Sequence, residues 1–134
     1  MQINAITGEI VDAAIKVHSA LGPGLMESVY EICLTHELRK RDLRVQQQVH
    51  LPVVYEGIRI EAGYRLDLLV EETVVVELKA VESVLPVHKA QLLSYLRLSG
   101  KPVGLLLNFN VIHMRDGIRR IVNRLPEPAL TATS

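Results

Sequence analysis

Cysteine and aromatic residues are nearly absent from this chain. Its 134 residues include one cysteine, one phenylalanine and no tryptophan. Because a lone cysteine cannot form an internal disulfide, a fold stapled by internal disulfides is excluded. Cys33 lies on a helical stripe, which favours a small buried side chain in a reducing compartment such as the cytoplasm.

An excess of charge of one sign is also missing. The 15 basic and 15 acidic residues give a formal net charge of zero, which removes any global electrostatic argument for nucleic-acid binding and leaves only a local basic patch. No apolar run approaches the length of a membrane span, and the N-terminus lacks the basic and apolar regions of a signal peptide. We therefore expect a cytoplasmic protein with no membrane partner.

The composition that remains is that of one globular domain. Hydrophobic residues make up 49% of the chain and charged residues 22%, and a chain of this length can bury a substantial core. We expect a single domain over residues 1–124. The proline-containing segment 125–134 is typical of a disordered C-terminal tail.

Hydrophobic periodicity predicts an α/β fold. Helical spacing marks three segments, and alternating or continuous apolar runs mark four strands. The predicted helices are 6–21, 25–41 and 86–99, and the predicted strands are 44–55, 58–70, 74–80 and 103–109. Residues 118–122 fit either a short strand or a helical turn. The order ααβββαβ, with a buried strand directly after the third helix, predicts a βαβ crossover in a mixed β-sheet flanked by helices.

Three charged residues interrupt the apolar hairpin of residues 65–79. Asp67 lies in its first strand, whereas Glu77 and Lys79 lie at the end of the second. Glu77 and Lys79 are two residues apart and therefore leave the same face of the strand. Asp67 lies on the same face of the hairpin only if the residue numbers of directly opposite positions in the two strands sum to an even number, about 144. That register requires a three-residue turn at 71–73 or a bulge.

Two carboxylates and one ammonium group on a single face allow two interpretations. Hard cations such as Mg²⁺ take oxygen ligands, commonly one or two carboxylates with waters and substrate phosphate. Such a cation polarises a phosphate and activates water, while Lys79 offsets the developing negative charge. The same residues are compatible with a structural lysine–carboxylate pair at the end of a strand.

Two predicted helices carry further candidate residues. In the second helix, Glu27, Tyr30 and Glu31 share a stripe that faces inward. The alternative for Glu27 is a solvated acid in the first turn, where a negative charge favours the helix dipole. In the third helix, Gln91 and Tyr95 share another stripe.

With these residues placed, the chain resembles the PD-(D/E)XK nuclease superfamily. The two-part core of that superfamily would be Asp67 followed by the tripeptide 77–79, a pattern that many hairpins match by chance. Residues 24–30 reproduce the motif of the GxxExxY protein family, a branch of the same superfamily. Residues 91–95 match the QxxxY element of RecB-type exonucleases. The resemblance spans roughly residues 5–123.

The resemblance implies a restriction-endonuclease-like core that binds Mg²⁺ or Mn²⁺ and hydrolyses nucleic acid, expected to be DNA. The implied metal ligands are Glu27, Asp67, Glu77 and the backbone carbonyl of Leu78. Lys79 would be the catalytic lysine.

Other implications of the resemblance concern the surroundings of this centre. Gln91 would belong to the catalytic set, and Gln91 and Tyr95 would shape the site or contact the nucleic-acid backbone. Tyr30 would shape the site or contact the substrate. RecB-type nucleases sometimes hold an iron–sulfur cluster through four cysteines, which a chain with one cysteine cannot do. A homodimer follows by analogy, since two sites can engage both strands of a duplex.

Two other functions compete with a nuclease. A catalytically silent module could keep the nuclease fold and bind nucleic acid or support assembly, in line with the zero net charge. A structural protein could instead oligomerise through an exposed sheet edge. That function requires the charged candidates to be scattered in space.

Overall fold

Apolar strands form the centre of the fold, because their side chains can be buried on both faces. The computed structural model describes residues 1–124 and contains a five-stranded sheet in the order β1-β4-β5-β6-β7. These strands are β1 (Val45–His50), β4 (Arg65–Val70), β5 (Val74–Lys79), β6 (Val103–Asn108) and β7 (Ile118–Val122).

One parallel pair makes this sheet mixed. β5 and β6 run parallel and are joined by α3 (Pro86–Ser99), while the other neighbouring strands are antiparallel. The predicted βαβ crossover is therefore confirmed. Residues 118–122 form a strand rather than a helical turn, and the short 3₁₀ helix η1 (Met114–Gly117) precedes them.

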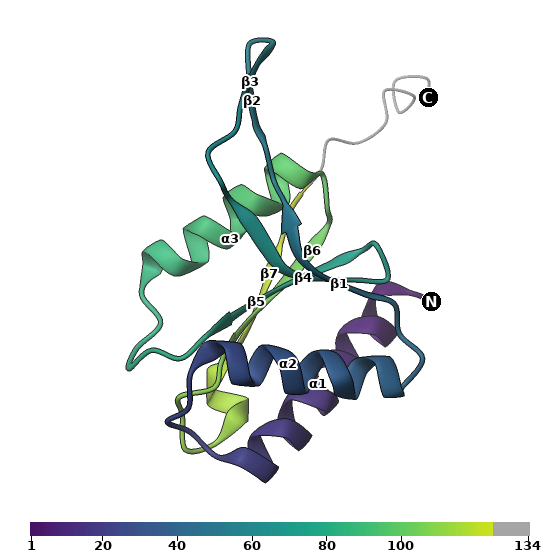
Figure 1. Ribbon diagram of the computed structural model, residues 1–134, viewed down its shortest axis with the longest axis vertical. Coiled ribbons are helices and arrows are strands. Elements are labelled where there is room, and N and C mark those ends of the chain that lie inside the picture. Colours follow the sequence, from purple (N-terminus) through teal and green to yellow (C-terminus); the bar gives the residue numbers. More distant parts are fainter. Residues whose placement is uncertain (125–134) are drawn as a thin grey trace.

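Helices cover both faces of the sheet (Figure 1). α1 (Ile3–Leu21) and α2 (Glu27–Lys40) lie on one face, and α3 lies on the other. Val76 of β5 belongs to the hydrophobic cluster under α1 and α2, whereas its neighbour Val75 belongs to the cluster under α3, and both are completely buried. The predicted mixed sheet flanked by helices is confirmed.

Two of the predicted strands are shorter in the structure than predicted. Residues 44–55 and 58–70 each break, and their inner parts form a separate hairpin of β2 (Val53–Tyr55) and β3 (Ile58–Ile60) that projects from the sheet (Figure 1). Pro52 has no N–H to continue the ladder. At the base of the projection, the Leu51 N–H donates to the Tyr64 carbonyl at 2.9 Å.

The helices follow the predicted segments closely. The first begins three residues earlier than predicted, and the third has the predicted bounds. Within residues 1–124, no helix is both long and apolar enough to cross a membrane. The predicted tail, 125–134, lies outside the described residues.

Candidate active site

The turn between β4 and β5 sets the register of their hairpin. Val70 pairs with Val74, which leaves residues 71–73 as a three-residue turn. The other pairs of this ladder keep the same even-sum register, so the predicted register is confirmed. It sets Asp67 opposite Glu77.

Asp67 and Glu77 each bind the backbone of the opposite strand. The Asp67 N–H donates to Glu77 Oε2 at 3.0 Å, and the Leu78 N–H donates to Asp67 Oδ2 at 2.9 Å. The regular ladder ends at the pair Leu68–Val76. Beyond it, the two carboxylates accept the N–H groups that strand carbonyls would otherwise take.

Burial disfavours the charged forms of the Asp67 and Glu77 carboxyl groups. Glu77 exposes only 6% of its surface, and this burial, together with the nearby charge of Asp67, raises its pKa to about 8. Burial also raises the pKa of Asp67, although the hydrogen bond from Leu78 opposes the shift. A cation beside the pair would favour both charged forms.

Lys79 supplies positive charge at the end of β5. Its ammonium group lowers the pKa values of Asp67 and Glu77, but burial raises them more. Across residues 1–124, no ion pair within 4.0 Å joins Lys79 to an acid. The simple structural lysine–carboxylate pair is therefore not what these residues form.

Glu31 of α2 is a third acid at this centre. The sequence places it on the inward stripe of the second helix, but it was not among the predicted metal ligands or catalytic residues. Its carboxylate accepts hydrogen bonds from Gln47 Nε2 at 3.2 Å and Gln48 Nε2 at 2.8 Å. Burial raises the pKa of Glu31, and the charge of Asp67 raises it further. Gln48 also donates to Asp67 Oδ1 at 3.4 Å. The inward stripe of the second helix was the signal in the sequence that pointed to this residue.

Glu27 begins α2 and is exposed. It lies one helical turn before Glu31, and its charge is among the causes that raise the pKa of Glu31, after burial and Asp67. The described residues give the Glu27 carboxylate no hydrogen-bond partner. It therefore faces solvent beside the acidic centre, which fits either a ligand completed by a cation or a solvated first-turn acid.

α3 contributes an aromatic wall to the centre. Tyr95 is buried and lies 5.8 Å from Tyr64, measured between ring centroids. Burial raises the pKa of Tyr95, and the charge of Glu77 adds to that shift. Gln91 lies one turn earlier on the same helix and is exposed, so its amide is free to meet a ligand from solvent.

The donor set suits a hard divalent cation. Two carboxylates, the Leu78 carbonyl and the nearby Glu31 offer oxygen ligands, and the raised pKa values mean that the anions lack compensation. Within residues 1–124, no three His, Cys, Asp or Glu side chains form a complete cage. Mg²⁺ does not require such a cage, because it is usually bound by one or two carboxylates with waters and substrate phosphates.

A family model agrees with this geometry. The model describes the PD-(D/E)XK nuclease superfamily and matches residues 4–121, which is most of the chain. The chain belongs to the PD-(D/E)XK nuclease superfamily. No curated protein and no solved structure matches it. The restriction-endonuclease-like fold predicted from the sequence is confirmed, and members of this superfamily generally use divalent metals.

Tyr30 has a structural role in the segment that leads to the site of this nuclease-superfamily chain. Its hydroxyl donates to the Gly22 carbonyl at 2.6 Å and accepts from the Leu25 N–H at 3.1 Å. Its ring is completely buried and stacks on Phe109 at a centroid distance of 4.5 Å. Tyr30 thus fixes the loop that leads into Glu27, and no hydrogen bond joins the two side chains.

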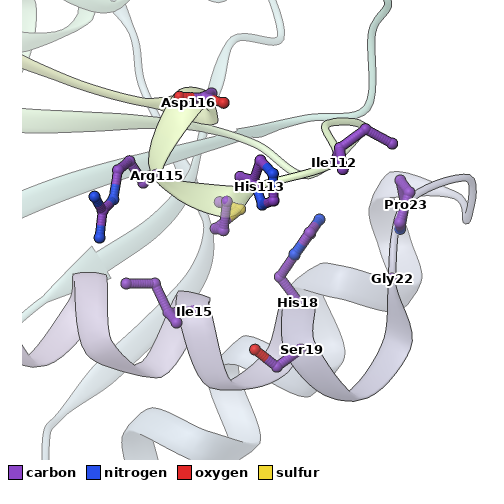
Figure 2. Close-up of a pocket in the computed structure, with 10 residues that line it drawn as sticks. Ile15, His18, Ser19, Gly22, Pro23, Ile112, His113, Arg115 and Asp116 are labelled. Carbon is purple, nitrogen blue, oxygen red and sulfur yellow. The ribbon is translucent and has the colours of Figure 1, made fainter.

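One pocket of this nuclease-superfamily chain lies away from the carboxylates. A pocket of about 690 Å³ lies between the end of α1 and η1 (Figure 2). His18 lines it, and the ring Nε2 bonds to the Val111 carbonyl at 2.7 Å. His18 is buried, so its ring is part of the packing between α1 and the loop before η1.

Proposed function

We propose that this chain is a metal-dependent nuclease that hydrolyses phosphodiester bonds of DNA, and that it belongs to the GxxExxY branch of its superfamily. One observation carries the proposal. Asp67 and Glu77 are held opposite each other although burial raises the pKa of each. Two desolvated acids side by side destabilise a fold unless a cation compensates them, and functional sites are where such arrangements concentrate.

The proposed metal ligands are Asp67, Glu77 and the Leu78 carbonyl, with Glu27 as the ligand from α2. Mg²⁺ or Mn²⁺ in this position supplies positive charge that polarises a phosphate and activates water. The ligand carboxylates would hold the cation in position. The half-buried Lys79 offsets the negative charge that develops on the phosphate oxygens.

The α3 residues act on the substrate rather than on the cation in this proposal. Gln91 is exposed, and its amide donates a hydrogen bond to a phosphate oxygen. Tyr95 forms a wall that excludes water from the carboxylates. Tyr30 shapes the site indirectly by holding the loop before Glu27.

A cleavage assay tests the proposal. Purified protein is incubated with Mn²⁺ or Mg²⁺ and with supercoiled, linear duplex and single-stranded DNA. We expect Glu77→Ala and Lys79→Ala to lower the cleavage rate by about 100-fold or more, because the first removes a ligand of the cation and the second removes a positive charge that offsets charge on the phosphate. Glu82→Ala, which removes an exposed acid of the loop after β5, is the matched control. Undiminished cleavage by Glu77→Ala would contradict the proposal.

Calorimetry separates this function from a silent nuclease-fold module. Titration with Mn²⁺ should show binding that Asp67→Asn and Glu77→Gln abolish. Glu27→Gln and Glu31→Gln compare the two α2 acids, and we expect the larger loss of affinity for Glu27→Gln. Absence of binding up to millimolar Mn²⁺ would favour the silent module.

The proposed assembly is a homodimer in which two sites act on the two strands of a duplex. Light scattering of the eluting protein gives its mass directly. A single species of about 30 kDa, twice the 15.0 kDa chain, is the expected result, and a species of chain mass alone would contradict a stable dimer.

A further inference from the structure

Short connections tie the pocket between α1 and η1 to the candidate active site. The Phe109 N–H donates to the Lys79 carbonyl at 2.9 Å, and Ile112 on the pocket wall follows three residues later. On the opposite wall, Pro23 precedes Glu27 by four residues. Because an extended chain spans at most about 3.6 Å per residue, both walls begin within about 15 Å of a candidate site residue.

The pocket presents a guanidinium, an imidazole and a hydroxyl group to solvent. Arg115 and His113 are exposed, and both line the pocket together with Ser19 of α1. Figure 2 shows Arg115 and His113 on the η1 side of the hollow and Ser19 on the α1 side. Asp116 also lines it, but its carboxylate lies on the side of η1 turned away from α1 (Figure 2). Within residues 1–124, the Arg115 guanidinium makes no ion pair.

Apolar side chains complete the lining. Ile112 exposes 78% of its surface and Ile15 exposes 39%, and Pro23 lies beside them. A site that only bound a small inorganic anion would gain nothing from these walls. A phosphate attached to a sugar and base would use both kinds of group.

The walls are also held in place. The Val111 carbonyl can only accept, so the His18 Nε2 that bonds to it carries the hydrogen. This bond joins α1 to the loop before η1. On the other side, the Tyr30 hydroxyl fixes Gly22. A volume of about 690 Å³ lies in the usual range of preformed ligand sites.

We propose that this pocket binds one phosphate-bearing nucleotide unit of the nucleic-acid strand next to the cleaved bond. Arg115 and His113 contact the phosphate, Ser19 donates to one of its oxygens, and Ile112 and Pro23 pack on the sugar or base. The proposal rests on the proposed nuclease function and adds a substrate contact remote from the carboxylates.

Binding without cleavage tests the subsite. A fluorescein-labelled single-stranded oligonucleotide is titrated with protein in EDTA, and its anisotropy is followed at several salt concentrations. We expect Arg115→Ala to weaken binding about tenfold, the usual size for a charged hydrogen bond, and to reduce the salt slope by about 0.7. Ile112→Ala, at a side chain too exposed to support the fold, should weaken binding with an unchanged slope.

Arg97→Ala is the matched control. Arg97 is exposed in the last turn of α3, at the end of the sheet away from the carboxyl ends of β5 and β6. Equal losses for Arg115→Ala and Arg97→Ala would overturn the subsite. A competition experiment gives a second test. The pocket is saturated with a nucleoside monophosphate, the oligonucleotide is added, and the NMR signals of the His113 ring are followed. If the oligonucleotide fails to displace the nucleotide, the subsite is overturned, because the pocket would then bind a free nucleotide.

The subsite and the nuclease function fail in different ways. Binding that depends on Arg115 without any metal-dependent cleavage would contradict the nuclease function and support the subsite. Cleavage that depends on Glu77, with a KM unaffected by Arg115→Ala, would contradict the subsite alone.

Discussion

Glu77 is the residue on which the chemistry of the site depends most. Its carboxylate is almost fully buried, bonds to the Asp67 N–H and lies near the Asp67 charge. These surroundings make the charged form costly in the absence of a cation. The same surroundings strengthen the attraction of a cation once one binds, because the local dielectric constant is low.

A pH titration of stability follows from Glu77. Its pKa is about 8 in the fold against an ordinary 4.5, so the folded state holds this proton more tightly than the unfolded chain does. The resulting stabilisation is fully present below about pH 4.5 and is lost as the pH rises through about 8. In EDTA, the free energy of unfolding should therefore fall by a few kcal/mol over this window.

Urea denaturation at pH 5, 6.5 and 8 measures this loss. Glu77→Gln, which stays neutral, should remove most of the pH dependence, and Glu82→Gln should leave it intact. An unchanged slope in Glu77→Gln would show that another group carries the effect. Added Mn²⁺ should reverse the trend, because the cation binds the charged form.

At the scale of elements, the turn at residues 71–73 decides whether a site exists. Removing one residue from it would pair Asp67 with a β5 residue of the other face. The turn also holds strain, since Glu71 and Glu72 have φ angles of 53° and 57°. Glu71 is compensated by accepting the Arg44 N–H at 2.7 Å, whereas Glu72 has no such bond among the described residues.

Glu72→Gly should therefore stabilise the protein. Glycine adopts positive φ without the cost that other residues meet there, and we expect a gain of about 0.5–1 kcal/mol, or a few degrees in Tm. Thr73→Gly is the control, because Thr73 has no positive φ and its hydroxyl donates to the Glu71 carbonyl at 2.7 Å. A lower Tm for Glu72→Gly than for the parent would contradict this explanation.

The approach of η1 to β6 gives a second element-scale prediction. A Cβ on Gly117 would lie 2.0 Å from the backbone oxygen of Asn108, whereas a Cβ on Gly8 of α1 would meet nothing within 4 Å. Gly117→Ala should destabilise the protein by about 3 kcal/mol. Gly8→Ala should stabilise it by about 0.5–1 kcal/mol. Thermal unfolding of the two variants distinguishes them, and shifts of the same sign would contradict the contact.

Sequence patterns predicted the elements that obey local rules. Parity along two strands was enough to predict the register of Asp67 and Glu77, because side chains alternate strictly there. The break at Leu51 and Pro52 was missed, since alternation continues through it while the chain leaves the sheet. Glu31 was missed as a metal ligand for a different reason: its environment depends on Gln47 and Gln48 of the next element, β1, and helical spacing does not predict contacts between elements.

At the scale of the molecule, the sheet brings distant parts of the chain to one end. Residues from α2, β4, β5 and the nearby α3 surround the carboxylates. The residues between β6 and β7 form one wall of the separate pocket, and the end of α1 forms the other (Figures 1 and 2). The third candidate function, a structural protein with scattered charges, is disfavoured by this convergence. The superfamily match agrees with the convergence, because it spans all of these elements.

The most direct test is a crystal structure of the protein soaked in Mn²⁺, with anomalous data collected to locate the cation. The account predicts an anomalous peak at about 2.1 Å from a carboxylate oxygen of Asp67, one of Glu77 and the carbonyl oxygen of Leu78. The Glu77→Gln variant soaked in parallel should lack the peak. Mn²⁺ found only elsewhere in the wild-type protein would contradict the account.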